Sequence, residues 1–496
     1  MPEPPRTLGG AERIAATPQF FGHPRGLSTL FFTEMWERFS YYGMRALLIL
    51  FMTAPAAQGG LGFDVATAGI IYGLYTAMAY MAALPGGWIA DRIIGQRRAV
   101  LYGGVLIALG NFTLVAPGVA TFYAGLVFVV AGTGLLKPNV SAIVGQLYSQ
   151  SDPRRDAGFS LFYMGINLGA FLSPILCGYA AARLGWRYGF LLAGIGMTLG
   201  LIQYALGSAY LGDAGRRSAG PDDTAARHQL IIGTAGTGAL LALTAALAMF
   251  DVVSVRTIVD ASGAMLLGVV VLFFGWMFFA AKWTPVERQR LIVVLVLFLA
   301  SAVFWSVFEQ AGSSMNLFAQ RSTDNQIGGF VIPAPWYQSI NALFIITLAP
   351  VFGALWLRLK DREPSSPAKF AWGLALVGLG FLVLAVGASL SASGARVSPL
   401  WLLVTYLLHT AGELCLSPVG LSAMTKLAPS RVAGLMMGVW FLSLSVGNYL
   451  GGRLASLYES LPLETLFGAV GLFAICAGLL LALFVKPMVR LMAGVR

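Results

Sequence analysis

Long apolar runs, separated by short polar connections, repeat along the whole chain. A helix needs about 20 apolar residues to cross the roughly 30 Å hydrocarbon layer of a membrane. About fourteen stretches reach that length, near residues 27–53, 66–90, 98–116, 119–145, 157–181, 188–212, 229–250, 258–281, 290–319, 336–357, 369–391, 399–426, 431–455 and 464–486. The pattern therefore predicts an all-α membrane protein. The polar residues before the first stretch do not resemble a cleavable signal.

The most polar connections, residues 213–228 and 358–369, suggest how these helices are grouped. The first connection follows six predicted helices and precedes two predicted helices with few polar residues, whose only acid is Asp260. We interpret this pair as an insertion between two six-helix halves. The predicted segments are a cytoplasmic amino-terminal segment (1–26), an amino-terminal bundle (27–212), a linker with two inserted helices (213–289) and a carboxy-terminal bundle with a short cytoplasmic tail (290–496).

Composition narrows the class of protein. Hydrophobic residues make up 57% of the 496 residues and charged residues 11%, whereas soluble domains carry about 25% charged residues. This excludes a soluble enzyme, a disordered scaffold and a secreted disulfide module. The three cysteines, Cys177, Cys415 and Cys476, lie in apolar runs, where a thiol behaves as a small hydrophobe. The sequence contains no metal-ligand cluster, phosphate loop or Ser-His-Asp order, so we expect no enzyme activity, cofactor or metal.

The net charge of +11 is explained by where the basic residues lie. If both termini are cytoplasmic, 23 of the 32 Lys and Arg residues fall in inner segments and six in outer loops. Basic residues resist translocation, so this asymmetry sets the orientation. We therefore predict cytoplasmic termini and a location in the cytoplasmic (inner) membrane, and nucleic acid is not needed as a partner.

Ionisable side chains at membrane depth are costly and point to function. Seven occur in four predicted helices: Glu34, Glu37, Arg38, Arg45, Lys137, Glu309 and Glu413. The plainer alternative is that they are helix-locking ion pairs or side chains that reach the membrane interfaces. Their number and their spread over four helices favour a functional interpretation.

The first helix carries several of these groups on one stripe, because Glu34, Glu37, Arg38, Tyr41 and Arg45 recur at steps of three or four. Glu34 lies one turn before Arg38 and is expected to pair with it. Glu37 and Arg38 are adjacent, so we expect them not to face each other directly. Movement of an arginine beside a buried carboxylate changes its proton affinity, which is what proton coupling requires.

Apart from the cluster of Glu34, Glu37 and Arg38, the two halves differ in the sign of their intramembrane charges. Without the inserted pair, Arg45 lies on helix one, Lys137 on helix four, Glu309 on helix seven and Glu413 on helix ten. In transporters built from two repeated six-helix halves, an axis normal to the membrane relates the halves and substrate binds between them. Helices one and seven, and four and ten, then correspond. A cavity with cations on one side and anions on the other suits a zwitterion.

Several strings resemble the motifs of the proton-coupled oligopeptide transporter family, a branch of the major facilitator superfamily. The first helix has E-x-x-E-R-F-x-Y-Y-G from Glu34 to Gly43, and the fifth has F-Y-x-x-I-N-x-G from Phe162 to Gly169. The remaining strings of the family are GTGLLKPN (132–139), FEQAGS (308–313), QSIN (338–341) and GELCLSPVG (412–420). A further string, GGWIADRIIGQRR (86–98), resembles the general facilitator loop between helices two and three, which indicates the fold but not the substrate. The resemblance implies the major facilitator fold.

The resemblance also implies import of di- and tripeptides, driven by protons through alternating access. The implied substrate-binding residues are Arg45, Tyr41, Tyr42, Tyr80, Lys137, Asn167, Trp305, Asn341, Glu413, Ser417 and Trp440. Arg45 and Lys137 would attract the peptide carboxylate, and Asn167, Asn341 and Glu413 would hold the amino terminus. Glu34, Glu37, Arg38 and Glu309 would couple the proton. Arg45–Glu309 would form an outer gate and Lys137–Glu413 an inner gate.

Alternatives remain at this stage. Position 308 is Phe, where some relatives place a second acid, so fewer proton sites remain in the carboxy-terminal half. Tyr and Trp also occur at membrane interfaces and in helix packing, so each aromatic has a packing interpretation. The same fold is also compatible with transport of nitrate or a peptide-like drug, although nitrate would not need Glu413. A membrane receptor or channel is the rival from another class. We expect peptides, protons and lipid as partners and a monomer.

Overall fold

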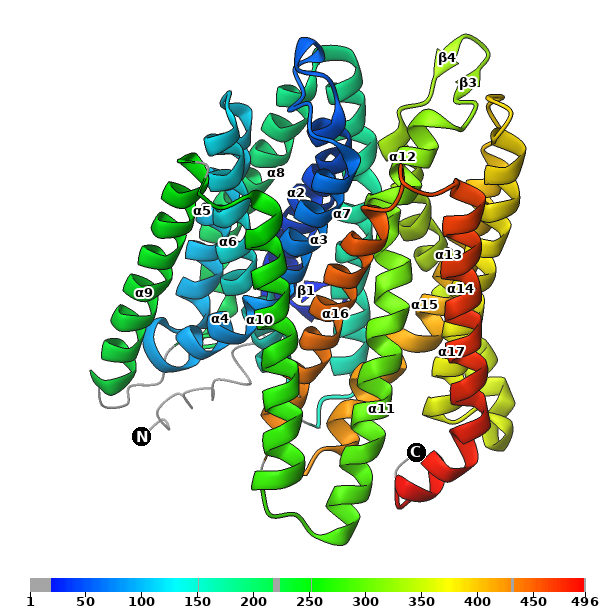
Figure 1. The fold of residues 1–496 in the computed structure, drawn as a ribbon. Coiled ribbons are helices and arrows are strands. Elements are labelled where there is room, and N and C mark those ends of the chain that lie inside the picture. Colours follow the sequence, from blue (N-terminus) through cyan, green and yellow to red (C-terminus); the bar gives the residue numbers. More distant parts are fainter. Residues whose placement is uncertain (1–18, 150, 217–223, 251, 430–431, 495–496) are drawn as a thin grey trace, which may run out of the picture.

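The structure, a computed structural model, describes residues 19–149, 151–216, 224–250, 252–429 and 432–494. Long helices run side by side through nearly all of this part of the chain (Figure 1). Twelve stretches of the described residues are long and apolar enough to cross a membrane. The helices α2 and α16 lie alongside them, which gives the predicted set of fourteen. The first 18 residues of the predicted segment 1–26 lie outside the described residues.

The amino-terminal bundle contains six membrane-crossing segments, as predicted. They are α2 (Gly26–Thr53), α3 (Val65–Met81) continued by α4 (Ala83–Ile89), α5 (Gln96–Val115), α6 (Val119–Gln146), α7 (Arg155–Leu184) and α8 (Trp186–Gly207). The helix α2 packs along α7 and α8, and α5 packs along α6 and α8. The most charged helix of the chain is therefore enclosed by other helices, and most of its residues are buried.

The inserted pair consists of α9 (Thr224–Met249) and α10 (Val255–Gly275). The helix α9 lies at the edge of the molecule (Figure 1) and is largely exposed. The helix α10 packs on α3 and α16, which come from different bundles. At this contact Arg453 of α16 pairs with Asp260 and with the hydroxyl of Tyr449. The single acid of the helices α9 and α10 thus attaches α10 to the carboxy-terminal bundle.

The carboxy-terminal bundle also has six crossing segments. They are α11 (Pro285–Phe308) continued by α12 (Ser314–Arg321), α13 (Gln338–Leu359), α14 (Ser366–Ser391), α15 (Leu400–Leu427), α16 (Ala433–Ala455) and α17 (Leu463–Leu491). The helix α14 packs along α15 and α17. The start of α11 is set by a capping box between Thr284 and Glu287, with Pro285 in the first turn. It therefore begins before the predicted residue 290.

Short elements fill the connections. The antiparallel hairpins are β1 (Gln19–Phe20) with β2 (His23–Pro24), and β3 (Gln326–Ile327) with β4 (Phe330–Val331). The helical turns are η1 (Ala56–Gln58), η2 (Ala90–Ile94), η3 (Ser208–Leu211), η4 (Trp276–Ala280), η5 (Glu309–Gly312), η6 (Ala334–Tyr337) and η7 (Lys360–Arg362). The crossing predicted near 290–319 consists of α11 and α12, which η5 separates. The backbone departs from helical geometry at Ser313, with φ −124° and ψ −95°.

The bundles meet along a seam between α3 and α16. A Cβ added at Gly73 would lie 2.6 Å from the Cα of Gly452, and one at Gly69 would lie 2.9 Å from the backbone nitrogen of Ser456. Small residues allow helix backbones to approach this closely in membranes. Ser445 of α16 also donates to the carbonyl of Ala77 at 2.8 Å. Backbone contact therefore joins the two halves here.

A second group of contacts joins the bundles at one end. Asn316 of α12 donates to the carbonyl of Ala46 at 2.8 Å, Trp336 of η6 to that of Ile175 at 3.0 Å, and Ser339 of α13 to that of Phe171 at 2.7 Å. This end carries the β3–β4 hairpin, opposite the start of α2 and the end of α17 (Figure 1). If the termini are cytoplasmic as predicted, these hydrogen bonds join the two bundles on the outer side of the membrane.

Candidate functional site

The charged segment of α2 is buried in the amino-terminal bundle. The Nε atom of Arg38 lies 3.1 Å from Glu34 Oε1 and also contacts the Glu37 carboxylate. The expected Glu34–Arg38 pair is present, but the expectation that Glu37 and Arg38 do not face each other is wrong. A flexible arginine side chain can bend toward its sequence neighbour, so one guanidinium serves both carboxylates. With all three ionised, this cluster has a net charge of −1.

The ion pair between Arg45 and Glu309 connects the bundles. Arg45 Nη2 lies 2.8 Å from Glu309 Oε2, and both side chains are about 5% exposed. Arg45 Nε also donates to the hydroxyl of Tyr72 on α3, at 2.8 Å. A Cβ at Gly312 would overlap that hydroxyl, so glycine in η5 allows the break in α11–α12 to pack against Arg45. The sequence indicated both ions but gave no indication of Tyr72 or of the break.

Two tyrosines of α2 lie beside these cations. Tyr42 lies between them, since the Cζ atoms of Arg38 and Arg45 are 5.9 Å and 5.5 Å from its ring centre. Arg38 is 5.3 Å from the ring of Tyr41. These distances lie within the range of cation–π attraction. Tyr41 is buried, whereas Tyr42 stays partly exposed. Arg38 therefore lies near both aromatic rings, and Arg45 lies near that of Tyr42.

Lys137 of α6 faces an aromatic surface rather than an acid. Its Nζ lies 3.9 Å from the ring centre of Tyr80 and 5.9 Å from that of Phe441 on α16. No carboxylate of the described residues lies within 4.0 Å of it, and the side chain is partly exposed. The Lys137–Glu413 contact is thus not made in this structure, and the inner gate stays a prediction. Phe441, beside the predicted Trp440, was not identified from the sequence.

Glu413 of α15 is held by a polar pair from its own bundle. The Nδ2 of Asn341 on α13 donates to Glu413 Oε2 at 3.1 Å and to the hydroxyl of Thr410 at 3.0 Å. Thr410, one turn before Glu413, was not singled out in the sequence, although its spacing placed it on the same face. Both Asn341 and Glu413 are partly exposed. A carboxylate and an amide therefore remain accessible.

The remaining predicted residues are less closely grouped. Asn167 is buried and donates to the carbonyl of Tyr163 in its own helix at 3.0 Å, so no contact with Asn341 or Glu413 is made.

Trp305 packs edge-on against Phe308, with ring centres 5.3 Å apart. A Cβ at Gly420 would overlap the ring of Trp440. Both tryptophans are buried, as in their packing interpretation. Ser417 lies on α15 and is partly exposed.

The arrangement offers charge recognition rather than covalent chemistry. The described residues contain no group of three His, Cys, Asp or Glu side chains that could hold a metal ion. Outside the cluster of Glu34, Glu37 and Arg38, cations lie on α2 and α6 and acids on η5 and α15, in the two halves that the sequence indicated. Lys137 and Glu413 are both partly exposed and unpaired with each other, so each remains available to an opposite charge.

The comparison with known families agrees with this arrangement. The sequence model of the POT family matches residues 97–473. The chain belongs to the POT family. The chain is 44% identical to the peptide transporter YePEPT of Yersinia enterocolitica, an alignment that covers 95% of this chain and 96% of that relative. It is 38% identical to a di-/tripeptide transporter of Lactococcus lactis subsp. cremoris, over 96% of this chain and 98% of that protein.

Solved structures of the POT family share the fold. A peptide transporter in complex with sulfate superposes with a TM-score of 0.91 at 42% identity, covering 98% of this chain and all of the other. A POT family transporter in complex with 5-aminolevulinic acid gives a TM-score of 0.87 at 37% identity, over 96% and 99% of the two chains. The predicted family, the major facilitator fold and the multi-pass location in the cytoplasmic membrane are confirmed. The chain is a transporter and not an enzyme.

Proposed function

We propose that this POT family member is a proton-coupled symporter that imports di- and tripeptides by alternating access, as a monomer in the bilayer. The observation that carries the proposal is the division of charge between the bundles: Arg45 and Lys137 on one side, Glu309 and Glu413 on the other. A short peptide is a zwitterion whose two charged ends are constant while its side chains vary. Relatives named as di-/tripeptide transporters support this substrate class.

In the proposed binding mode, the peptide carboxylate binds Arg45 and Lys137. Its ammonium group binds Glu413 and Asn341, which already form a polar pair, and Asn167 when its side chain turns from its own helix. Tyr41, Tyr42, Tyr80, Trp305, Trp440 and Ser417 are the remaining proposed substrate residues. Aromatic rings suit varied side chains because they accept both apolar and cationic groups.

Proton coupling is proposed to use Glu34, Glu37 and Arg38, together with Glu309. The two carboxylates of α2 share one guanidinium, so the buried cluster carries an uncompensated negative charge until a proton binds. Such a charge is costly at membrane depth. Protonation of Glu309 would weaken its attraction to Arg45 and open the outer side, while Lys137 and Glu413 would approach each other to close the inner side. The proposed moving bodies are residues 27–212 and 290–496, with 213–289 as the insertion.

The substrate class is tested by uptake into proteoliposomes with an imposed pH gradient. We expect unlabelled di- and tripeptides to compete with a labelled dipeptide, and tetrapeptides and nitrate to compete poorly. Equal competition by nitrate would reject the peptide assignment. A flux that fails to saturate with peptide would instead favour a channel.

Two variants test the binding residues. Lys137→Ala and Glu413→Ala should each abolish concentrative uptake, because each removes one of the two charges proposed to bind the peptide ends. Lys486→Ala, which changes an exposed lysine of α17, is the control and should behave like the unmodified chain. Full accumulation by either test variant contradicts the proposed binding mode.

A third variant tests proton coupling separately from peptide binding. Glu37→Gln should impair acid-driven uptake yet spare peptide counterflow, because exchange of peptide across the membrane needs no net proton movement. Glu464→Gln, in the first turn of α17, is the matched control. Unchanged acid-driven uptake in Glu37→Gln would remove this residue from the proton pathway.

A further inference from the structure

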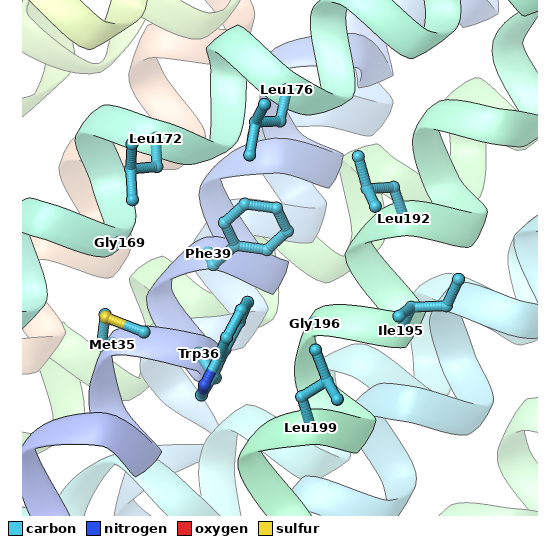
Figure 2. A pocket seen from close by; sticks show the side chains of 10 residues that line it. All are labelled: Met35, Trp36, Phe39, Gly169, Leu172, Leu176, Leu192, Ile195, Gly196 and Leu199. Carbon is cyan, nitrogen blue, oxygen red and sulfur yellow. The ribbon is translucent and has the colours of Figure 1, made fainter.

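A groove opens on the outside of the amino-terminal bundle, between α2, α7 and α8. Its volume is about 160 Å³. Figure 2 shows leucine side chains of α7 and α8 on either side of Phe39, with Trp36 beside it at the base. The groove presents an apolar surface, so no group within it can anchor a charged or strongly polar ligand.

The groove lies at the depth of the hydrocarbon layer. Its α7 residues, 169–176, are central in Arg155–Leu184, and its α8 residues, 192–199, are central in Trp186–Gly207. Leu176 and Leu199 at its rim are 47% and 44% exposed. In a chain that crosses the membrane, exposed leucines at this depth face lipid. The mouth of the groove is therefore continuous with the lipid-facing surface.

Two glycines help to form the space. A Cβ at Gly196 would lie 2.5 Å from a ring carbon of Phe39, and one at Gly200 would lie 2.7 Å from the Cβ of Trp36. The helix α8 thus touches α2 at these points, and leucines of α7 and α8 line the groove beside Phe39. The result is a walled depression rather than a flat helix face.

We propose that this groove is a binding site for one acyl chain of a membrane lipid. An apolar cavity of roughly 150 Å³ stays dry and accepts a benzene-sized molecule, so this groove has room for a short stretch of acyl chain but offers water no partner. Hydrocarbon already surrounds the protein, and burial from water therefore gives no preference. The preference arises from dispersion contacts, because a chain in the groove touches protein on three sides and a chain on a flat face touches it on one.

The position of this site gives it a consequence for α2. Trp36 and Phe39 form its base, and Glu34, Glu37 and Arg38 lie between and beside them along the same helix. A bound acyl chain fills the space behind the charged segment and braces α2 against α7 and α8. The site does not depend on which substrate the protein transports, so its test is independent of the proposed function.

The test uses the full-length protein in proteoliposomes containing a phosphatidylcholine with a diazirine at the middle of one acyl chain. After irradiation, labelled residues are mapped by mass spectrometry. We expect groove residues such as Leu172 and Leu192 to be labelled about threefold or more above Ile202 of α8, because the trapped chain is held against several surfaces. Ile202 is 52% exposed and lies outside the groove. Labelling that simply follows the exposed fraction of each side chain would overturn the proposal.

Two variants provide a second test, in which labelling of the groove residues is compared. Leu199→Trp fills the mouth of the groove and should reduce labelling of Leu172 and Leu192 to the level of Ile202. Ile202→Trp adds the same bulk to the same helix outside the groove and should leave their labelling unchanged. Equal labelling of the groove in both variants would overturn the proposal, and the map of the unmodified protein decides the question if either variant fails to fold.

Discussion

At the scale of single residues, Arg45 joins the two bundles through a buried ion pair. It pairs with Glu309 of the other bundle, donates to Tyr72 and lies near the ring of Tyr42. A buried guanidinium is tolerated only when its charge and its donors are matched. Glu309, Tyr72 and Tyr42 together surround this one charged side chain.

The Arg45–Glu309 pair leads to a prediction about stability. Arg45→Ala and Glu309→Ala should each lower the free energy of unfolding by about 3–5 kcal/mol, because each leaves an uncompensated buried charge. The double variant should lose less than the sum of the two. The measurement is chemical unfolding in a mild detergent. Arg321→Ala is the control, since its pair with Glu459 is exposed and such pairs contribute about 0–1 kcal/mol. Losses as small as that of the control would contradict the prediction.

Several residue-level features were predictable because spacing on a helix fixes which side chains share a face. The Glu34–Arg38 pair and the charges at Arg45 and Glu309 follow from such spacing and from the cost of charge in a membrane. Tyr72, Thr410 and Phe441 were missed because a tyrosine, a threonine or a phenylalanine in an apolar helix carries no comparable signal. Only the approach of another helix makes them partners.

At the scale of elements, caps and breaks position the site. The helix α3, which carries Tyr72 and Tyr80, begins at a cap: Thr67 donates its backbone N–H to Asp64 at 2.8 Å. That hydrogen bond holds the pKa of Asp64 below its usual value. The break at η5 then brings Glu309 to the place that Tyr72 and Arg45 define.

The cap of α3 predicts a pH-dependent difference in stability. Asp64→Ala should cost about 1 kcal/mol at neutral pH. The pKa of Asp64 is lower in the folded than in the unfolded protein. Its contribution to the free energy of unfolding is therefore fully present above the unfolded pKa of about 3.9, and it is lost as the pH falls through the folded pKa. The difference in unfolding free energy between the unmodified protein and Asp64→Ala should therefore become smaller below about pH 3.9. Asp64→Asn keeps the cap without titrating and serves as the control. A gap that does not change with pH would contradict this assignment.

The attachment of α10 gives a second prediction at this scale. Asp260→Asn removes the charge that pairs with Arg453, so α10 should be held less firmly against α16. We expect faster amide hydrogen exchange over residues 255–275, with α14 unaffected. Arg256→Ala, at an exposed position of the same helix, is the control. If amide hydrogen exchange in α10 is no faster in Asp260→Asn than in Arg256→Ala, the apolar contacts hold the helix without the ion pair.

At the scale of the whole molecule, the contacts between bundles are unevenly distributed. Arg45–Glu309, Asn316, Trp336 and Ser339 join the halves at the end away from the termini. The described residues include no ion pair between Lys137 and Glu413 toward the other end. Under the predicted orientation, these contacts lie on the outer side, whereas Lys137 and Glu413 make no ion pair with each other.

The proposed coupling sets a limit on accumulation by the whole protein. Moving one charge through 100 mV is worth about 2.3 kcal/mol, which corresponds to a concentration ratio of about fifty at 1.4 kcal/mol per tenfold. A neutral dipeptide carried with one proton should therefore reach a plateau near fifty-fold in vesicles held at 100 mV without a pH gradient. The plateau is measured with a labelled, non-hydrolysed dipeptide. A plateau far above this ratio would require more than one proton per cycle.

The sequence by itself determined the membrane environment, the approximate helix positions, the two halves and, outside the cluster of Glu34, Glu37 and Arg38, the sign of the intramembrane charges in each half. These properties follow from the length of apolar runs and from the cost of burying a charge in hydrocarbon, and both are local along the chain. Only the tertiary structure decided that Arg38 contacts both glutamates, that η5 interrupts α11 and α12, that Asn167 bonds to its own helix and that Lys137 faces Tyr80 and Phe441. These choices depend on which helices meet and how far each side chain reaches, and such distances are set by packing between segments far apart in sequence.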